Sequence, residues 1–161
     1  MNQKELIFGT SENLSFQTLD YVLKKNLKIH TSFEYKSFLK LAKIYRQKKF
    51  QNKIILKLKI TDSEELIKKL AKFFFLFKTE KLFAVQLSGS LIFSKNFDKI
   101  YKLIQKFIKE KKIEKIYLEN YWEYSKTNFK YIQKYNFDGI VAPYNLVERE
   151  IDNDLIKYLR S

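Results

Sequence analysis

The sequence predicts an α/β fold in which about six parallel β-strands alternate with helices. Short apolar or alternating runs are each followed by a segment whose apolar residues recur at helical spacing, and this succession repeats along the whole chain of 161 residues. Strict alternation of this kind indicates a parallel sheet with crossover helices. No linker or break in composition interrupts it, so residues 1–161 are expected to form a single domain.

The expected elements follow one another in order. Ser15 is a plausible N-cap for the first helix, and the sequence Thr-Asp-Ser at 61–63 is a plausible cap for the third. The run "KIILKLKI" alternates most clearly and is the best strand, while the aromatic run at 73–77 is expected in a helix core. Strands are expected at 6–10, 27–31, 53–60, 82–88, 115–120 and 139–145. Helices are expected at 15–26, 34–49, 63–78, 96–111, 125–135 and 152–159.

Two architectures fit this alternation, an open doubly wound sheet and part of a (β/α)8 barrel. A doubly wound nucleotide-binding sheet normally carries a glycine-rich turn after its first strand. Here "FGTSENLS" offers one glycine, and neither G-x-G-x-x-G nor a Walker sequence occurs. Periodicity therefore favours the barrel without deciding between the two.

Composition excludes several kinds of site. The chain has no cysteine and one histidine, which rules out disulfides, zinc knuckles, thiol nucleophiles and a multi-histidine metal site within one chain, so no metal is expected. The most apolar run, "AKFFFLF", is too short to cross a bilayer, so no membrane contact is expected. The lack of cysteine fits a reducing compartment, and a cytoplasmic protein is expected. The formal charge of +14 raises the possibility of a nucleic-acid partner, but the lysines are spread over most of the chain, which favours a solvated surface.

Five strand ends resemble the aldo/keto reductase family. "LKIHTSFEY" is similar to its second strand, which ends in Asp-Thr-Ala/Ser with a tyrosine five residues after the Asp. "KIILKLKI", "FAVQLSGS" and "KKIEKIYLENYW" resemble the third, fourth and fifth strands, and "FDGIVAPYNLVERE" most resembles the sixth. The resemblance covers the whole chain but only about three quarters of the family's barrel, because nothing matches strands seven and eight. It therefore decides between the two architectures and implies an incomplete (β/α)8 TIM-type barrel of about six parallel strands.

The resemblance implies a carbonyl reductase site. In the family a tyrosine donates the proton, a lysine lowers that tyrosine's pKa, an aspartate holds the lysine and a histidine orients the carbonyl. The tyrosine and lysine positions match Tyr35 and Lys59, whereas the aspartate position holds His30 and the histidine position holds Ser88. Two of the four roles are kept. A neutral imidazole cannot hold Lys59 by an ion pair.

The resemblance also implies NADP as cofactor. The family's Ser-Asn pair that grips the nicotinamide amide matches Glu119 and Asn120, and a further amide contact on the sixth strand matches Val141. Only Asn120 keeps its type. A carboxylate and a valine in place of two polar amide partners make a poor nicotinamide site, and the unmatched strands carry most of the family's grip on the cofactor phosphates.

Alternation along the strands places further polar residues on the inner face of the barrel. If Lys59 points inward, so does Lys57. The same parity turns inward Lys28, Gln86, Tyr117 and Glu119. Because an unpaired buried cation is costly, we expect either an ion pair between Glu119 and one of the two lysines, or a wet, open lumen.

Three functions follow from these observations. The first is an aldo/keto reductase-like partial barrel with little or no carbonyl reductase activity alone. The second is a divergent NADP-dependent reductase completed by a partner chain, since six strands in barrel order leave two unpaired edges that invite self-association or a complementing C-terminal chain. The third is a basic binding module for nucleic acid or an acidic partner.

Overall fold

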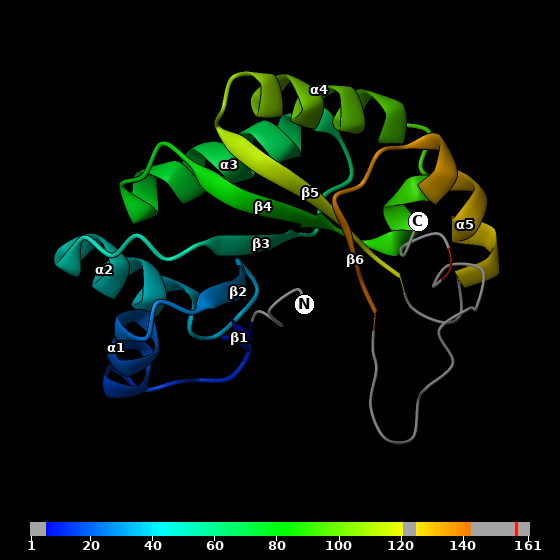
Figure 1. Ribbon diagram of the computed structural model, residues 1–161. Helices are drawn as coiled ribbons and strands as arrows, with labels where there is room; N and C mark the ends of the chain where they lie inside the picture. Colours follow the sequence, from blue (N-terminus) through cyan, green and yellow to red (C-terminus); the bar gives the residue numbers. More distant parts are fainter. Residues whose placement is uncertain (1–5, 121–124, 143–156, 158–161) are drawn as a thin grey trace.

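The computed structural model describes residues 6–120, 125–142 and 157 (Figure 1). One sheet of six strands runs in the order β1-β2-β3-β4-β5-β6, and each neighbouring pair is parallel. The strands are β1 (Ile7–Gly9), β2 (Lys28–Ser32), β3 (Ile54–Leu58), β4 (Leu82–Leu87), β5 (Ile113–Glu119) and β6 (Gly139–Val141). The sheet curls into half of a barrel, which confirms the predicted fold class.

Helices connect the strands and cover the outer, convex side of the sheet (Figure 1). They are α1 (Phe16–Lys24), α2 (Phe38–Lys48), α3 (Ser63–Phe77), α4 (Phe97–Lys109) and α5 (Ser125–Lys134), with the short 3-10 helix η1 (Gly89–Phe93) between β4 and α4. The sequence did not predict η1. The helix expected at 152–159 and the end of the strand expected at 139–145 lie outside the described residues.

Side-chain caps set the beginnings of two helices as predicted. The Ser15 hydroxyl accepts a hydrogen bond from the Thr18 amide at the start of α1. Asp62 caps α3 by accepting from the Glu65 amide, and the Glu65 carboxylate in turn accepts from the Thr61 amide. These reciprocal bonds fix where α3 leaves the end of β3.

The second helix begins four residues later than expected. Residues 33–37 form a turn, and α2 starts at Phe38 because Ser37 is held outside the helix. Its hydroxyl accepts from the Leu14 amide at 2.8 Å and donates to the Glu12 carbonyl. This tie between the loops after β1 and β2 leaves room for the turn that carries Tyr35.

The main core lies between the sheet and the outer helices. Leu56, Val85 and Ile116 face it from three strands, each fully buried. Phe73 and Phe77 of α3 stack at 4.4 Å between ring centroids, which confirms the helix-core interpretation for these two residues. It is wrong for Phe75, whose side chain is 76% exposed. The run at 73–77 is therefore amphipathic rather than buried throughout.

The inner face holds a much smaller apolar cluster. Ile55, Phe83 and Ala84 pack together there, with Tyr117 against them. Tyr117 also needs the glycine of β6, because a Cβ on Gly139 would lie 3.0 Å from the Tyr117 ring. Most other inward positions are polar, as the alternation of the strands predicted.

We expect Phe73→Ala to lower the free energy of unfolding by about 3–5 kcal/mol, because it leaves a cavity in the main core. Phe75→Ala, in the same helix and with the same chemical change, should stay within about 0.5 kcal/mol because its ring is exposed. Urea unfolding of the two variants measures both effects. Equal losses would show that α3 does not pack on the sheet through Phe73.

Candidate functional site

The register of the sheet sets polar side chains side by side on its inner face. Ser32, Lys57, Gln86, Tyr117 and Gly139 form one row across five strands. One step nearer the starts of the strands, Gly9, His30, Ile55, Ala84 and Lys115 form a second row. Because side chains alternate along a strand, each row projects to the same side of the sheet.

An ion pair joins β3 and β5 across this face. Lys57 Nζ lies 2.6 Å from Glu119 Oε1, and it donates a hydrogen bond to that carboxylate. The Glu119 residue is 6% exposed, and the Lys57 side chain 28%. The expected pairing of Glu119 is therefore confirmed, and its partner is Lys57. A pair this sheltered depends on both members, because either charge left alone would be poorly solvated.

Tyr35 lies half-buried in the turn after β2, where its amide donates to the Ser32 carbonyl. Its ring meets the His30 ring edge-on at 5.8 Å. Burial raises the pKa of the Tyr35 hydroxyl, and the Glu119 and Glu34 carboxylates raise it further, while the positive charge of Lys57 opposes them. The cation that acts on Tyr35 is thus Lys57.

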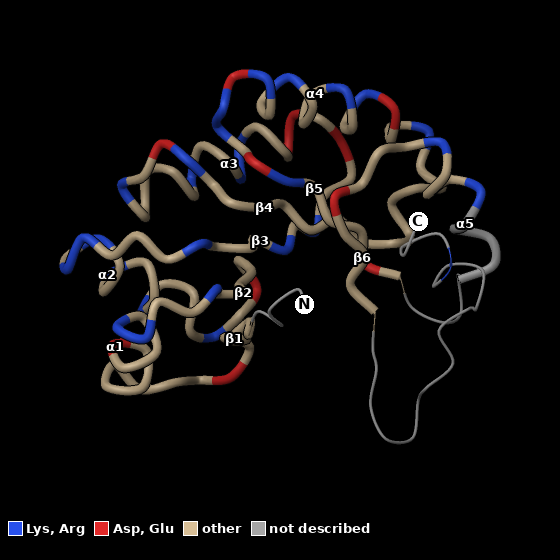
Figure 2. Tube along the Cα trace, in the orientation of Figure 1, with Lys and Arg blue, Asp and Glu red and all other residues tan. Residues whose placement is uncertain are grey.

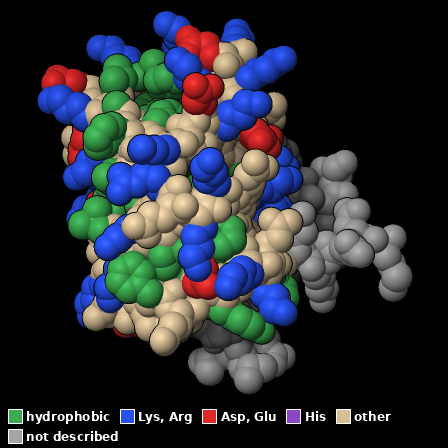
Figure 3. Space-filling model, turned by 90° about the vertical axis from the view of Figure 1, so that its left-hand side faces the viewer, with side chains coloured by type: hydrophobic (Ala, Val, Ile, Leu, Met, Phe, Trp, Pro, Cys, Tyr) green, Lys and Arg blue, Asp and Glu red, His purple; other side chains and the backbone are tan. Residues whose placement is uncertain are grey.

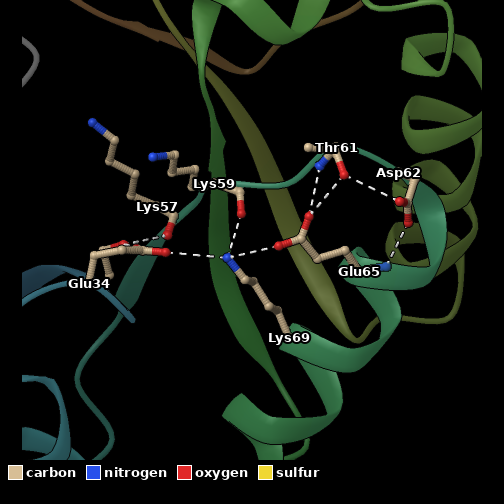
Figure 4. Close-up of polar contacts among 8 residues, drawn as sticks. Glu34, Lys57, Lys59, Thr61, Asp62, Glu65 and Lys69 are labelled. Carbon is tan, nitrogen blue, oxygen red and sulfur yellow. Dashed lines mark hydrogen bonds and ion pairs between the residues drawn. The ribbon is translucent and has the colours of Figure 1, made fainter.

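Lys59 stands one residue beyond the end of β3 and is exposed. Figure 4 shows its side chain extending to the same side as that of Lys57, away from Lys69. In the described part of the chain the Lys59 ammonium makes no ion pair, and only its backbone carbonyl is engaged, by Lys69 Nζ. No described contact joins Lys59 to Tyr35, and the cation that acts on Tyr35 is Lys57, two residues earlier than Lys59.

Tyr35, His30, Lys57 and Glu119 are called the Tyr35 cluster below. A second polar network, at the start of α3, lies beside it (Figure 4). Lys69 Nζ is 3.3 Å from carboxylate oxygens of both Glu34 and Glu65. Glu34 also accepts a hydrogen bond from the Ser32 hydroxyl. Lys69 therefore ties the turn carrying Tyr35 to the helix after β3. The sequence analysis missed Glu34 and Lys69, although the spacing of Glu65 and Lys69 by four residues was a visible signal.

His30 sits on the inner face between Gly9 and Ile55, half-buried. Burial is the main cause of its lowered pKa, with a smaller contribution from the Lys57 charge, while Gln86 and Glu119 oppose the shift. The imidazole is therefore neutral at pH 7. Its Nε2 and the Gln86 Oε1 are both buried, and neither has a well-aligned hydrogen-bond partner among the described residues. His30 takes no part in holding a lysine.

Ser88 follows β4 and caps η1 through its backbone position. Its side chain is partly exposed, and its hydroxyl lies 3.0 Å from the Ser90 hydroxyl. One hydroxyl at this strand end can still donate to a carbonyl oxygen. It cannot exchange a proton near neutral pH as an imidazole does.

The three positions matched to the nicotinamide amide do come together at the ends of β5 and β6. The backbone N–H of Asn120 donates a hydrogen bond to the Val141 carbonyl, with 2.8 Å between the two atoms. Glu119, the last residue of β5, directly precedes Asn120. Glu119 is engaged by Lys57, however, and the Val141 side chain offers no hydrogen bond. The only amide side chain of the three, that of Asn120, is 3% exposed. These residues do not fit a nicotinamide, which needs several amide partners at once.

The described residues hold neither a metal site nor a membrane-spanning helix. They contain no group of three or more histidine, cysteine, aspartate or glutamate residues placed to hold a metal ion. None of their helices is both long and apolar enough to span a membrane.

No protein-family model matches the sequence, and none of the curated proteins matches it. Solved structures do match its fold. A putative aldo-keto reductase from Pseudomonas aeruginosa superposes with a TM-score of 0.75 at 16% identity, over 96% of this chain and 68% of that one. The glycerol dehydrogenase from Gluconobacter oxydans gives 0.74 at 16% identity, over 96% and 55%. The holo form of an aldo-keto reductase from Bacillus halodurans gives 0.77 at 15% identity, over 96% and 57%.

These neighbours share the order of strands and helices found here. The chain spans between about half and two thirds of their lengths, and its own length is matched almost completely. Identities this low establish the architecture and leave the chemistry to the residues themselves. The described part of the chain has an aldo/keto reductase-like fold of six parallel strands with their connecting helices.

Proposed function

We propose that this chain is an aldo/keto reductase-like partial barrel with little or no carbonyl reductase activity on its own. The observation that supports this most strongly is the pairing of Lys57 with Glu119 at 2.6 Å beside Tyr35. The carboxylate offsets the one positive charge that would help Tyr35 release its proton. The tyrosine is left with a raised pKa, contrary to the need of a proton donor.

The other roles of a carbonyl reductase are also poorly supplied. His30 is neutral and cannot anchor a lysine, and Ser88 offers one hydroxyl where an imidazole would orient the substrate. The amide-binding positions Glu119 and Val141 are unsuited to a nicotinamide. The Lys57–Glu119 pair is instead a structural tie across the inner face, between β3 and β5.

A second candidate is a reductase completed by further strands, on this or another polypeptide. Both ends of the sheet favour it: β1 pairs with β2 alone and β6 with β5 alone among the described strands. Ile7 on β1 is 53% exposed and Val141 on β6 is 36% exposed. Edges of this kind accept another strand readily, whether from a complementing chain or from a second copy. Completion would add surface for NADP that the six units lack.

Titration of the chain into NADPH tests the proposal. We expect no saturable change in nicotinamide fluorescence in the micromolar range, because only one amide partner is present. Saturable binding that is lost in Asn120→Ala would overturn the proposal and favour a working cofactor site. If binding appears only when the chain is mixed with a polypeptide carrying the remaining βα units of a neighbour, the second candidate is supported.

The structural role of the ion pair predicts different effects for the two lysines. Lys57→Gln should lower the free energy of unfolding by about 1–3 kcal/mol, because Glu119 is left buried without its cation. Lys59→Gln removes the same charge two residues later and should change stability by less than about 0.5 kcal/mol.

Urea unfolding at neutral pH measures both. The double change of Lys57→Gln with Glu119→Gln should recover most of the loss, since the orphaned charge is removed as well. Equal effects of the two lysine variants would contradict a structural role for the pair.

The lowered pKa of His30 predicts a loss of stability in acid. In the unfolded chain the imidazole takes up a proton near pH 6.5, the ordinary pKa of histidine. In the folded chain it resists protonation until a lower pH. Stability from this group is therefore complete above pH 6.5 and declines as the pH falls below it. His30→Gln should be free of this decline.

His30 is the only histidine, so the difference between the two pH profiles isolates it, and its single imidazole signal can be titrated directly by NMR. An imidazole titrating above pH 6.5 in the folded chain would show that it is not buried as described.

A further inference from the structure

A basic cavity lies at the opposite end of the strands from the candidate site. It has a volume of about 840 Å³ and opens between the ends of α2 and α3 and the starts of β3 and β4. Five cationic residues line it: Arg46, Lys49, Lys53, Lys78 and Lys81. Two acidic residues, Glu80 and Glu114, also line it. The ratio of cations to acids is therefore higher here, five to two, than in the chain as a whole, which has 32 Lys and Arg against 18 Asp and Glu.

The views of the molecule agree with this excess. In Figure 2 basic residues mark the far end of α2 and the segment leading into β3. Figure 3 looks at this end of the molecule, and Lys and Arg side chains are spread across it with fewer acidic ones among them. The strands begin on this side, so the surface is separate from the Tyr35 cluster at their carboxyl ends.

Three ammonium groups converge beside the cavity on one aromatic ring. The Nζ atoms of Lys28, Lys53 and Lys115 lie 4.6, 4.9 and 5.7 Å from the centre of the Phe83 ring. Phe83 itself lines the cavity and is 6% exposed. Lys53 also borders a second hollow, of about 350 Å³, that Lys28 shares. The ring thus joins the basic cavity to the inner face of the half-barrel.

This convergence has an electrostatic cost. Each cation–π contact contributes only about 0.5–1 kcal/mol at a partly exposed site. The three ammonium groups share one ring and repel one another, with a screening length of about 8 Å at physiological ionic strength. Among the described residues neither Lys53 nor Lys115 forms an ion pair, and the same holds for Lys81, which lines the cavity. A bound anion would relieve the repulsion.

Some of the cations have a structural reason to be there. Arg46 lies in the last turn of α2, and Lys49 and Lys78 follow the ends of α2 and α3, where positive charge stabilises the helix dipole. Lys53 and Lys81, which also line the cavity, directly precede β3 and β4 and are not at a helix end. These two lysines therefore carry the argument for a ligand.

We propose that this cavity binds a small, multiply charged anion through phosphate groups, with Lys53 and Lys81, which both line it, as its main contacts. The volume suits a small ligand. Lysine ammonium groups bind phosphate oxygens as point charges from several directions, as they are arranged here. The burial of Phe83 argues against a single-stranded nucleic acid, because such ligands stack their bases on exposed rings. The inference is independent of any reductase activity.

Calorimetric titration of the full chain with inorganic tripolyphosphate tests this proposal. The variant carries both Lys53→Gln and Lys81→Gln. The matched control carries Lys102→Gln and Lys109→Gln, two exposed lysines of α4, and so removes the same net charge. At about 0.15 M ionic strength, where general attraction is screened, we expect the first variant to bind at least about tenfold more weakly than the unchanged chain. The control should bind nearly as tightly as the unchanged chain.

The alternatives give different results. Equal weakening in both variants would mean that net charge alone attracts the anion, and would overturn the site. Absence of saturable binding to the unchanged chain would overturn it as well. Duplex DNA that binds more tightly than tripolyphosphate and is weakened equally by both variants would point to a general nucleic-acid surface instead. ATP should compete with tripolyphosphate if the phosphate chain is what is recognised, and failure to compete would contradict that.

Discussion

The parallel register of the six strands is the constraint on which the rest of the structure depends. Once neighbouring strands are aligned in parallel, inward side chains fall into rows, such as Ser32, Lys57, Gln86 and Tyr117. Outward side chains meet the helices and form the main core. The helices hold the sheet in its curl, but the register decides which polar groups become neighbours. The meeting of Lys57 with Glu119 beside Tyr35 is a consequence of it.

Within that frame, one carboxylate changes the character of the inner site. Glu119 is close enough to Lys57 to form a sheltered ion pair, and both act on the pKa of Tyr35 with opposite sign. The pair therefore joins β3 to β5, and its carboxylate opposes the effect of the lysine on the tyrosine. Burial of Tyr35 raises the pKa of its hydroxyl as well.

Alternation in the sequence was sufficient to predict six parallel strands and to place Lys57, Lys59 and Glu119 on one face of the sheet. The strand order and the inward direction of that face followed from the resemblance. Alternation could not decide which lysine meets Glu119, because that depends on side-chain reach near the end of β3. It also placed the start of α2 too early, since the tie between Ser37 and Leu14 joins two loops distant in sequence. The network of Lys69 with Glu34 was missed for the same reason: a turn residue's direction is set by tertiary contacts.

The two ends of the strands treat the same residue type in opposite ways. At the carboxyl ends lysines are matched with acids, Lys57 with Glu119 and Lys69 with Glu34 and Glu65. At the amino ends lysines gather round Phe83 and line a cavity with few acids. The lining of this cavity therefore holds an excess of positive charge that neighbouring acids do not neutralise, and this excess is what the proposed anion would neutralise.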